Sequence, residues 1–452
     1  MNPTCASTAR RVFGSSLLLL GLFAFWSCNA QTQSESESAP YPGNLVLNQG
    51  PAGFRQQYGF WPLSKASGLK GSLCWCGPTD IKPNGQADAP TRTSILQRVD
   101  IGGAKADQIY NFVLPPYARH NIGAITAPVF KGSKDQYFVR ATRYTTDVGQ
   151  YSLYELSSAR KSGILREDNL YLIYRFQVSP SGNHYAFEIA EPYSDANYAL
   201  VSNNMGQRKV ISEDPTTRTF SWSSRNTLIY SAFPKNPDYK KNWGYPNVYE
   251  NDLKGNVKLL KDGGYSPLLS PNGRHIASFV AHVDTETSKN IADNLNFDPY
   301  RVNRVGISVF DQETQKEKIF TRIYEEYARL LWAGDSQKLY VVENYYVFSK
   351  KTVFCRISVF DVQSQSYTLL CKLEQKGEAT SSDDAKLLPY FTPVKIANDK
   401  YLLFCVPVND LAVQNYHLLA VDLMSGKRHD IYSFPSAVSR GNPLSIDWID
   451  SQ

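Results

Sequence analysis

The 452-residue sequence lacks the short motifs that mark several large enzyme classes. It contains no glycine-rich phosphate loop, no HExxH zinc motif and no EF-hand calcium loop. It also lacks a Gly-x-Ser-x-Gly nucleophile elbow, since the similar segment Gly264–Leu268 does not have the final glycine. These absences argue against a P-loop nucleotide enzyme, a zinc protease of that type and an α/β-hydrolase, and they predict no cofactor.

The excess of positive over negative charge is also small. Lys and Arg number 48 against 42 Asp and Glu, so the net charge is +6, and the two signs are interspersed along the chain. No long basic block appears. So small a net charge on a large domain predicts no nucleic-acid partner.

Methionine is rare and aromatic residues are plentiful. Three Met stand against 29 Tyr and 22 Phe. Aromatic side chains suit a half-buried pleated surface, and no long amphipathic helical pattern is found. The composition therefore favours an all-β fold.

The N-terminus has the charged-then-apolar order of a secretory signal. Arg10 and Arg11 precede an apolar run over residues 12–26, which is too short to cross a bilayer comfortably. The small residue Ser27 then comes directly before Cys28, and this order resembles the lipobox of bacterial lipoproteins. The resemblance implies that residues 1–27 are a signal peptide and that Cys28 carries a lipid anchor to the membrane.

The lipobox match departs from the usual pattern at Phe25, where the family has Leu. Two alternatives are ordinary secretion with cleavage after Ala30, giving a secreted soluble protein, and an uncleaved anchor. Residues 28–43 are polar and acidic, so we expect a disordered tether ahead of a single domain at 44–452. The predicted location is the cell envelope, as an outer-membrane lipoprotein facing the periplasm or the surface.

Five cysteines remain beyond Cys28, and an odd number does not make a disulfide framework. Cys74 and Cys76 flank Trp75 on an expected strand and cannot easily bridge each other. Cys355 and Cys371 lie on opposite arms of an expected hairpin. A disulfide between them is possible in an oxidising compartment, and buried free thiols are the favoured interpretation.

A two-part unit recurs along the chain. Its first half is an apolar strand, a tight turn of Pro, Asn, Gly or Ser, and a second strand, because those residues supply the backbone angles of a tight reversal. The clearest copies begin at Phe176, Phe220, Leu268 and Leu331, with weaker copies at Lys131 and Ile396. Its second half is a strand that runs into Asp and a polar turn, beginning at Val248, Ile307, Ile357 and Leu418. The spacing of about 43 to 64 residues suits a four-stranded propeller blade.

The segments SPSGNHYAFEI and SPNGRHIASFV resemble the repeat motif of TolB-like, WD40-related (PD40) β-propellers over residues 120–430. Ser181 and Asn272 stand where that motif has Asp. The resemblance implies a propeller of four-stranded blades, with seven favoured and six or eight as alternatives. The tail at residues 443–449 looks like a lone first strand that completes the N-terminal blade and closes the ring.

Metal chemistry is weakly indicated. Propellers such as the oligogalacturonate lyases hold a metal with clustered histidines. Here His184 and His275 share one repeat position, which indicates common ancestry of the repeats and not a metal site. Only His282 and His417 lie at strand ends that could face a shared surface. We predict no metal site.

Three insertions between second and third strands carry the candidate binding residues. They span residues 232–247, 282–303 and 344–352 and are rich in Tyr, Trp, Asn and Lys, which suits contact with a glycan or protein. The alternative interpretation is plain solvated loops. The candidate residues are Tyr239, Trp243, Tyr245, Tyr300, Tyr345 and Tyr346.

Two functions from different classes follow. The first is a non-catalytic binding or scaffold module for an envelope protein or a glycan, with no catalytic residues. The second is a glycan-acting lyase with its site at the mouth of the propeller channel.

Overall fold

The computed structural model describes the chain in separate stretches. These are residues 44–49, 61–62, 68–78, 93–101, 109–113, 123–125, 136–145, 148–157, 162–170, 172–190, 198–203, 207–213, 220–234, 246–281, 305–323, 328–376, 390–410, 413–435 and 446–450. Contacts divide the chain into two units, Met1–Tyr41 and Pro42–Gln452, and every described residue lies in the second. The predicted signal peptide and the whole predicted tether, Cys28 included, lie outside the described residues. No helix in the described stretches is long and apolar enough to cross a membrane.

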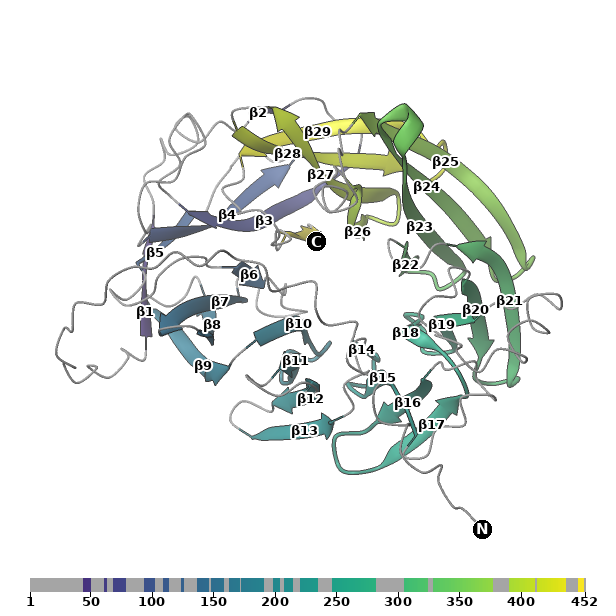
Figure 1. Cartoon of the computed structure of the whole chain (residues 1–452), viewed down its shortest axis with the longest axis horizontal. Coiled ribbons are helices and arrows are strands. Elements are labelled where there is room, and N and C mark those ends of the chain that lie inside the picture. The colour runs from purple at the N-terminus through teal and green to yellow at the C-terminus, as the bar shows by residue number, and fades with distance from the viewer. Residues whose placement is uncertain are drawn as a thin grey trace, which may run out of the picture. The chain divides into compact units, whose positions relative to one another are not determined.

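The described strands form antiparallel sheets, shown as successive groups of arrows in Figure 1. Four sheets have four strands each, paired in chain order. The first is β10 Leu172–Val178, β11 Tyr185–Ala190, β12 Tyr198–Asn203 and β13 Arg208–Ser212. The second is β14 Phe220–Trp222, β15 Leu228–Ala232, β16 Asn247–Asn251 and β17 Val257–Lys261. The third is β18 Tyr265–Leu269, β19 His275–Ala281, β20 Val305–Asp311 and β21 Lys316–Ile323. The fourth is β22 Ala328–Trp332, β23 Lys338–Val347, β24 Thr352–Asp361 and β25 Ser366–Lys376.

Two further sheets contain the same four-stranded group with added strands. One comprises β26 Thr392–Ala397, β27 Tyr401–Asp410, β28 Val413–Asp422 and β29 Arg428–Pro435, with β2 Trp61–Pro62 paired to β29. The other has nine strands. They are β30 Ile446–Asp450, β3 Gly71–Pro78, β4 Thr93–Ile101, β5 Ile109–Val113, β1 Asn44–Gln49, β9 Ser162–Leu170, β8 Val148–Ser157, β7 Gln136–Thr145 and β6 Gly123–Ile125. In it, β1 joins the outermost strands of two groups, β5 and β9.

The C-terminal strand lies where the sequence placed it. β30 pairs with β3, and Trp448 lies opposite Leu73, with both side chains fully buried. The tail therefore supplies the first strand of the N-terminal group. Together these sheets make the architecture a β-propeller of four-stranded blades, while the count of seven and the closed ring stay predictions.

The first repeated motif is the turn between the first and second strands of a sheet. In each copy whose turn the structure describes, a backbone N–H donates to the carbonyl three residues earlier, as in Gly182 to Ser179 and Gly273 to Ser270. The fourth turn residue of these two copies, and of the copy ending at Asn226, has a left-handed φ between 60° and 75°. Glycine and asparagine tolerate that conformation better than other residues. This requirement explains the recurring Gly or Asn in the sequence.

Side chains from one turn accept hydrogen bonds from the backbone of a neighbouring sheet. The bonds run from Ser181 N to Asn226 Oδ1 (2.9 Å), Asn272 N to Ser336 Oγ (2.9 Å), Gly334 N to Asp399 Oδ1 (3.1 Å) and Lys70 N to Asn398 Oδ1 (3.1 Å). Each of the four acceptors lies in the turn between the first and second strands of its own sheet. Each donor belongs to a chain segment outside that sheet. The turns therefore reverse the chain within a sheet and also join neighbouring sheets through hydrogen bonds.

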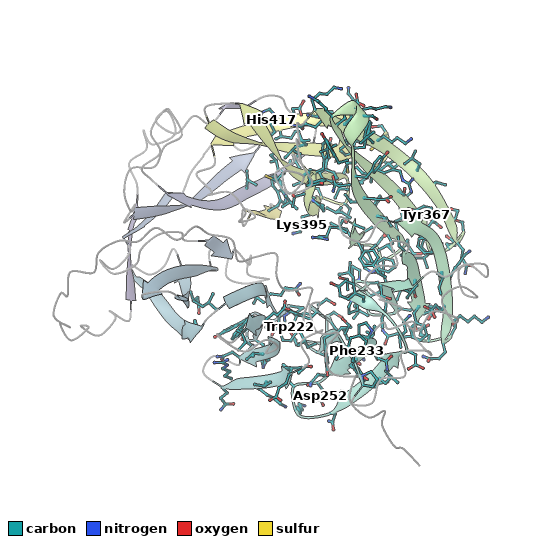
Figure 2. The ribbon with its side chains drawn as sticks, viewed as in Figure 1. Trp222, Phe233, Asp252, Tyr367, Lys395 and His417 are labelled. Carbon is teal, nitrogen blue, oxygen red and sulfur yellow. The ribbon has the colours of Figure 1, made fainter. Side chains whose placement is uncertain are left out.

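Tryptophan makes a second recurring link. Trp222 Nε1, on β14 (Figure 2), donates to the carbonyl of Gln177 in the preceding sheet at 3.2 Å. Trp332 Nε1 donates in the same way to Leu268 at 3.0 Å. The rings approach His184 and His275 at 6.4 and 6.1 Å between centroids. Each tryptophan therefore fills the space between two sheets while its N–H is satisfied.

The hydrophobic core is divided among the spaces between sheets. One cluster joins Phe279 and Ile307 of the β18–β21 sheet to Leu339 and Phe360 of the β22–β25 sheet. Phe320 stacks on Phe360 at 4.5 Å between centroids. Since each sheet buries a face against its neighbour, no sheet has a complete core of its own.

The second repeated motif is the turn before each outermost strand. The carboxylates of Asp252, Asp311, Asp361 and Asp422 accept backbone N–H groups two to four residues further on. Hydrogen bonds from Arg274 hold the pKa of Asp311 well below its usual value, as do the backbone bonds. The aspartates thus stabilise the polar turns that the sequence pattern identified.

Replacing Asn226 separates the two roles of the turn residue. Asn226→Gly keeps the left-handed φ of 60° but removes the acceptor for Ser181 N, so we expect a loss of about 1 kcal/mol of unfolding free energy. Asn226→Ala also strains the backbone and should lose about 2 kcal/mol. Urea unfolding measures both, with the neighbouring exposed Arg225→Ala as control. Equal stability of Asn226→Gly and the native chain would contradict the linking role.

Because of His275, we expect the folded chain to lose stability as the pH is lowered. Burial lowers its pKa below the ordinary 6.5, with Arg274 acting in the same direction and Asp311 and Glu313 opposing. Below pH 6.5 the unfolded chain therefore binds more protons than the folded chain, so unfolding becomes easier as pH falls from 7 to 5. His275→Leu should show a smaller loss over that interval in urea titrations at each pH. An unchanged pH dependence in the variant would refute this assignment.

Candidate binding surface

The predicted loop over residues 344–352 is wrong, because the segment is a continuation of two strands. β23 extends to Val347 and β24 begins at Thr352, and these two residues face each other in register. The short 3₁₀ turn η3 (Phe348–Lys350) and Lys351, with a φ of 47°, reverse the chain. Aromatic and β-branched residues favour paired strands over loop. We call residues 344–354 the long hairpin.

One face of the long hairpin carries an aromatic pair. Tyr345 and Phe354 lie opposite each other and stack, with ring centroids 5.4 Å apart and planes 16° from parallel. The Lys350 ammonium lies 5.7 Å from the centre of the Phe354 ring. Both rings are half-buried, so part of each remains accessible. The pair stiffens the hairpin and presents its remaining surface beside a cation.

Lysines gather at the end of the long hairpin. Lys376, on β25, donates to the Lys350 carbonyl at 3.3 Å and to Thr352 Oγ1 at 3.2 Å. Thr352 Oγ1 in turn donates to the Lys350 carbonyl at 2.8 Å. Lys350, Lys351 and Lys376 are exposed. The end of the hairpin is therefore cationic and is fixed by hydrogen bonds to the adjacent strand.

The opposite face of the long hairpin is attached to the neighbouring sheet. The buried Asn344 side chain donates from Nδ2 to the Phe391 carbonyl and accepts at Oδ1 from Phe391 N, both at 3.0 Å. Tyr346 packs against the core cluster that contains Phe391. Two paired backbone groups and a packed ring hold this hairpin in one position.

An ion pair lies at the base of the long hairpin. Arg356 Nη2 is 3.3 Å from Glu343 Oε2, and the Glu343 side chain is only 6% exposed. Such a pair satisfies a carboxylate that burial would otherwise penalise. The pair is therefore structural.

The cysteines of this sheet are free thiols. Cys355 and Cys371 form no disulfide, and Cys405 in the next sheet is also free. Burial raises the pKa of Cys355 and raises that of Cys371 to about 11, so both are protonated at neutral pH and poorly nucleophilic. The expectation of buried free thiols is confirmed for this pair, with Cys371 half-buried. The side chains of Cys74 and Cys76 lie outside the described residues.

The other predicted site residues fall mostly beyond the described stretches. Tyr239, Trp243, Tyr245 and Tyr300 lie in undescribed parts of the other two insertions. Of the first insertion, the structure describes only residues 232–234, including Phe233 (Figure 2), and 246–247. Of the predicted binding residues, it therefore describes Tyr345 and Tyr346, which point to opposite faces of one hairpin.

The histidine pair of the lyase hypothesis is half described. His417 lies on β28 (Figure 2), and burial lowers its pKa. His282 lies outside the described residues. Within the described stretches, no three His, Cys, Asp or Glu side chains are grouped as metal ligands.

Sequence reasoning missed Phe354, Lys376 and Asn344. Phe354 had a readable signal, because it lies in a short apolar run, Val353–Cys355, of β-branched and aromatic type that is typical of a strand. Lys376 and Asn344 had none, since their partners Lys350 and Phe391 are 26 and 47 residues away in the chain. Such pairings depend on strand register and on the packing of one sheet against the next.

No protein-family model and no curated protein matches the sequence. Among solved structures, the chain is similar to TolB from Acinetobacter baumannii, with 13% identity over 81% of each chain and a TM-score of 0.39. It is similar to an oligogalacturonate lyase in complex with manganese, with 10% identity over 84% of this chain and 98% of that one, at a TM-score of 0.43. It is also similar to the propeller domain of the trilobed protease from Pyrococcus furiosus, with 11% identity over 72% and 100%, at 0.41. The structural neighbours are thus TolB-like and other β-propellers.

Removing the Asn344 side chain tests how the long hairpin is held. Asn344→Ala leaves the N–H and carbonyl of the buried Phe391 without their partner, which should lower the unfolding free energy by roughly 3 kcal/mol. Urea unfolding measures the loss. Asn183→Ala, an exposed turn residue, is the matched control and should change stability by less than about 0.5 kcal/mol. A loss no larger than the control's would mean that the hairpin is held by other contacts.

Proposed function

We propose that the chain is an extracytoplasmic lipoprotein, anchored through Cys28, whose propeller is a non-catalytic binding module for an envelope protein or a glycan. The observation that carries the proposal is the long hairpin, in which Tyr345 and Phe354 stack beside Lys350 and Lys376 of the adjacent strand is hydrogen-bonded to the hairpin end. A preformed surface of this kind binds without first having to be ordered. Its aromatic edges, tyrosine hydroxyl and ammonium groups suit polar and anionic partners.

The charges of the long hairpin support binding over turnover. The buried carboxylate at its base, Glu343, is held in an ion pair with Arg356. Acid–base catalysis needs a titratable group within hydrogen-bond reach of the reacting proton. The lyase alternative required His282 and His417 together, and no observation in the described stretches favours it.

Charge reversal on the long hairpin tests the binding role. Lys350→Glu/Lys351→Glu should reduce crosslinking of the full-length protein to its envelope partner by roughly tenfold, because a cationic surface becomes anionic. In-cell crosslinking followed by affinity purification measures this. Arg225→Glu/Lys427→Glu changes the net charge equally at two exposed positions outside the hairpin and should leave crosslinking unchanged.

A Cys28→Ala arm of the same experiment tests the anchor. The Cys28→Ala substitution should move the protein out of the membrane fraction, and capture of the partner should fall as the membrane-bound protein is lost. Equal crosslinking in the two charge variants would contradict the hairpin surface. Depolymerisation of a polysaccharide by the purified chain would replace the binding role with the lyase.

A further inference from the structure

Among the described residues, the large exposed aliphatic side chains lie on four strands. β13, β17, β21 and β25 are the outermost strands of four successive sheets, and we call them the outer rim. The described residues include six exposed large hydrophobic side chains, and five of them lie on the outer rim. They are Val210, Val257, Leu259, Ile319 and Leu369, each 47–53% exposed.

Positive charge is concentrated on the same four strands. Their sequences contain nine Lys or Arg and two Asp or Glu, whereas the whole chain has 48 and 42. The buried Lys261 is 2.9 Å from Glu317 and cancels one of the acids. The outer rim is therefore far more basic than the chain as a whole.

Some rim lysines also connect neighbouring sheets. Lys209 Nζ donates to the carbonyl of Leu253, and Lys318 Nζ donates to that of Gln365. These bonds fix the ammonium groups close to the strand ends while their charge remains. Arg208, Lys258, Lys316 and Lys372 are exposed on the rim.

The remaining outermost strands are different in both charge and surroundings. β5, β9 and β29 together contain two basic and three acidic residues. Each has a further strand of this chain beside it, because β1 pairs with β5 and β9 and β2 pairs with β29. In the described part of the chain, the rim strands end their sheets. The basic and aliphatic character thus belongs to the edges beside which the described residues place no further strand.

We propose that the outer rim is a peripheral binding surface for the anionic headgroups of a lipid bilayer. Its cations are mostly lysine and its apolar residues are Val, Leu and Ile. Protein interfaces are depleted of lysine and enriched in aromatic residues, whereas lysine beside aliphatic side chains suits a lipid surface, where the stem lies against apolar groups and the charge meets phosphate. The repetition of these residues over four strands matches an extended surface better than a small ligand.

This surface is distinct from the long hairpin and does not depend on its binding role. The test uses the full chain with Cys28→Ala, so that no acyl chain contributes. Binding is measured by sedimentation with vesicles of pure phosphatidylcholine, and with vesicles of two parts phosphatidylcholine to one part phosphatidylglycerol. The N-terminal apolar segment is common to all samples, so the ratio of the two affinities isolates the contribution of charge.

We expect tighter binding to the phosphatidylglycerol vesicles at low salt and loss of the preference at high salt. Lys258→Glu/Lys316→Glu should reduce the preference by at least about tenfold. The control Arg225→Glu/Lys427→Glu has the same net charge and lies off the rim, so its preference should be unchanged. An equal reduction in both variants, or no preference in the parent chain, would overturn the proposal.

A second measurement is independent of substitution at the lysines. A photo-crosslinking amino acid at Leu259 should give a phospholipid adduct in cells, detected as a mass increase of the intact protein. The same amino acid at Met424, which is exposed but lies outside the rim, should give none. A protein adduct at Leu259 in place of lipid would assign the rim to a protein partner and overturn the lipid proposal.

Discussion

The contact between one sheet and the next is the constraint on which the rest of this structure depends. A four-stranded sheet buries a face only against a neighbour, and here the clusters around Phe279, Phe360 and Phe404 lie between sheets or span two of them. Dispersion and hydrophobic burial are not directional, so they do not fix how one sheet is aligned with another. The hydrogen bonds from turn to turn supply that alignment, because each joins a particular backbone N–H to a particular side-chain oxygen.

The same constraint explains why the sequence repeat is visible at all. Asn226 and Ser336 each combine a left-handed backbone with an oxygen that a neighbouring sheet needs. Few residues meet both demands, so turn positions vary less freely than the strand faces, where many apolar residues are equivalent. The turns and the Asp-capped reversals therefore predicted the four-stranded units and the role of the C-terminal strand.

The candidate site was less predictable for a related reason. Residues 344–352 are polar and aromatic, and such composition is common to loops and to solvent-exposed strands. The structure resolves the ambiguity through two residues. The Asn344 side chain hydrogen-bonds to both backbone groups of Phe391, and Tyr346 packs against the core cluster that contains Phe391. These partners are distant in sequence, and no local pattern identifies them. The long hairpin is a strand pair because a neighbouring sheet supports one of its faces.

The outermost strands differ in charge because some of them pair with a further strand and others are open sheet edges. An open edge presents backbone groups to which another chain can add a strand, and exposed lysines oppose such pairing. The edges of β5, β9 and β29 are beside strands of the same chain and have no need of lysine. The open edges of β17 and β21 carry Lys258 and Lys316. Exposed Leu259 and Ile319, on the same strands as those lysines, do not protect an edge. Edge protection alone therefore leaves them unexplained, whereas the proposed lipid surface accounts for them.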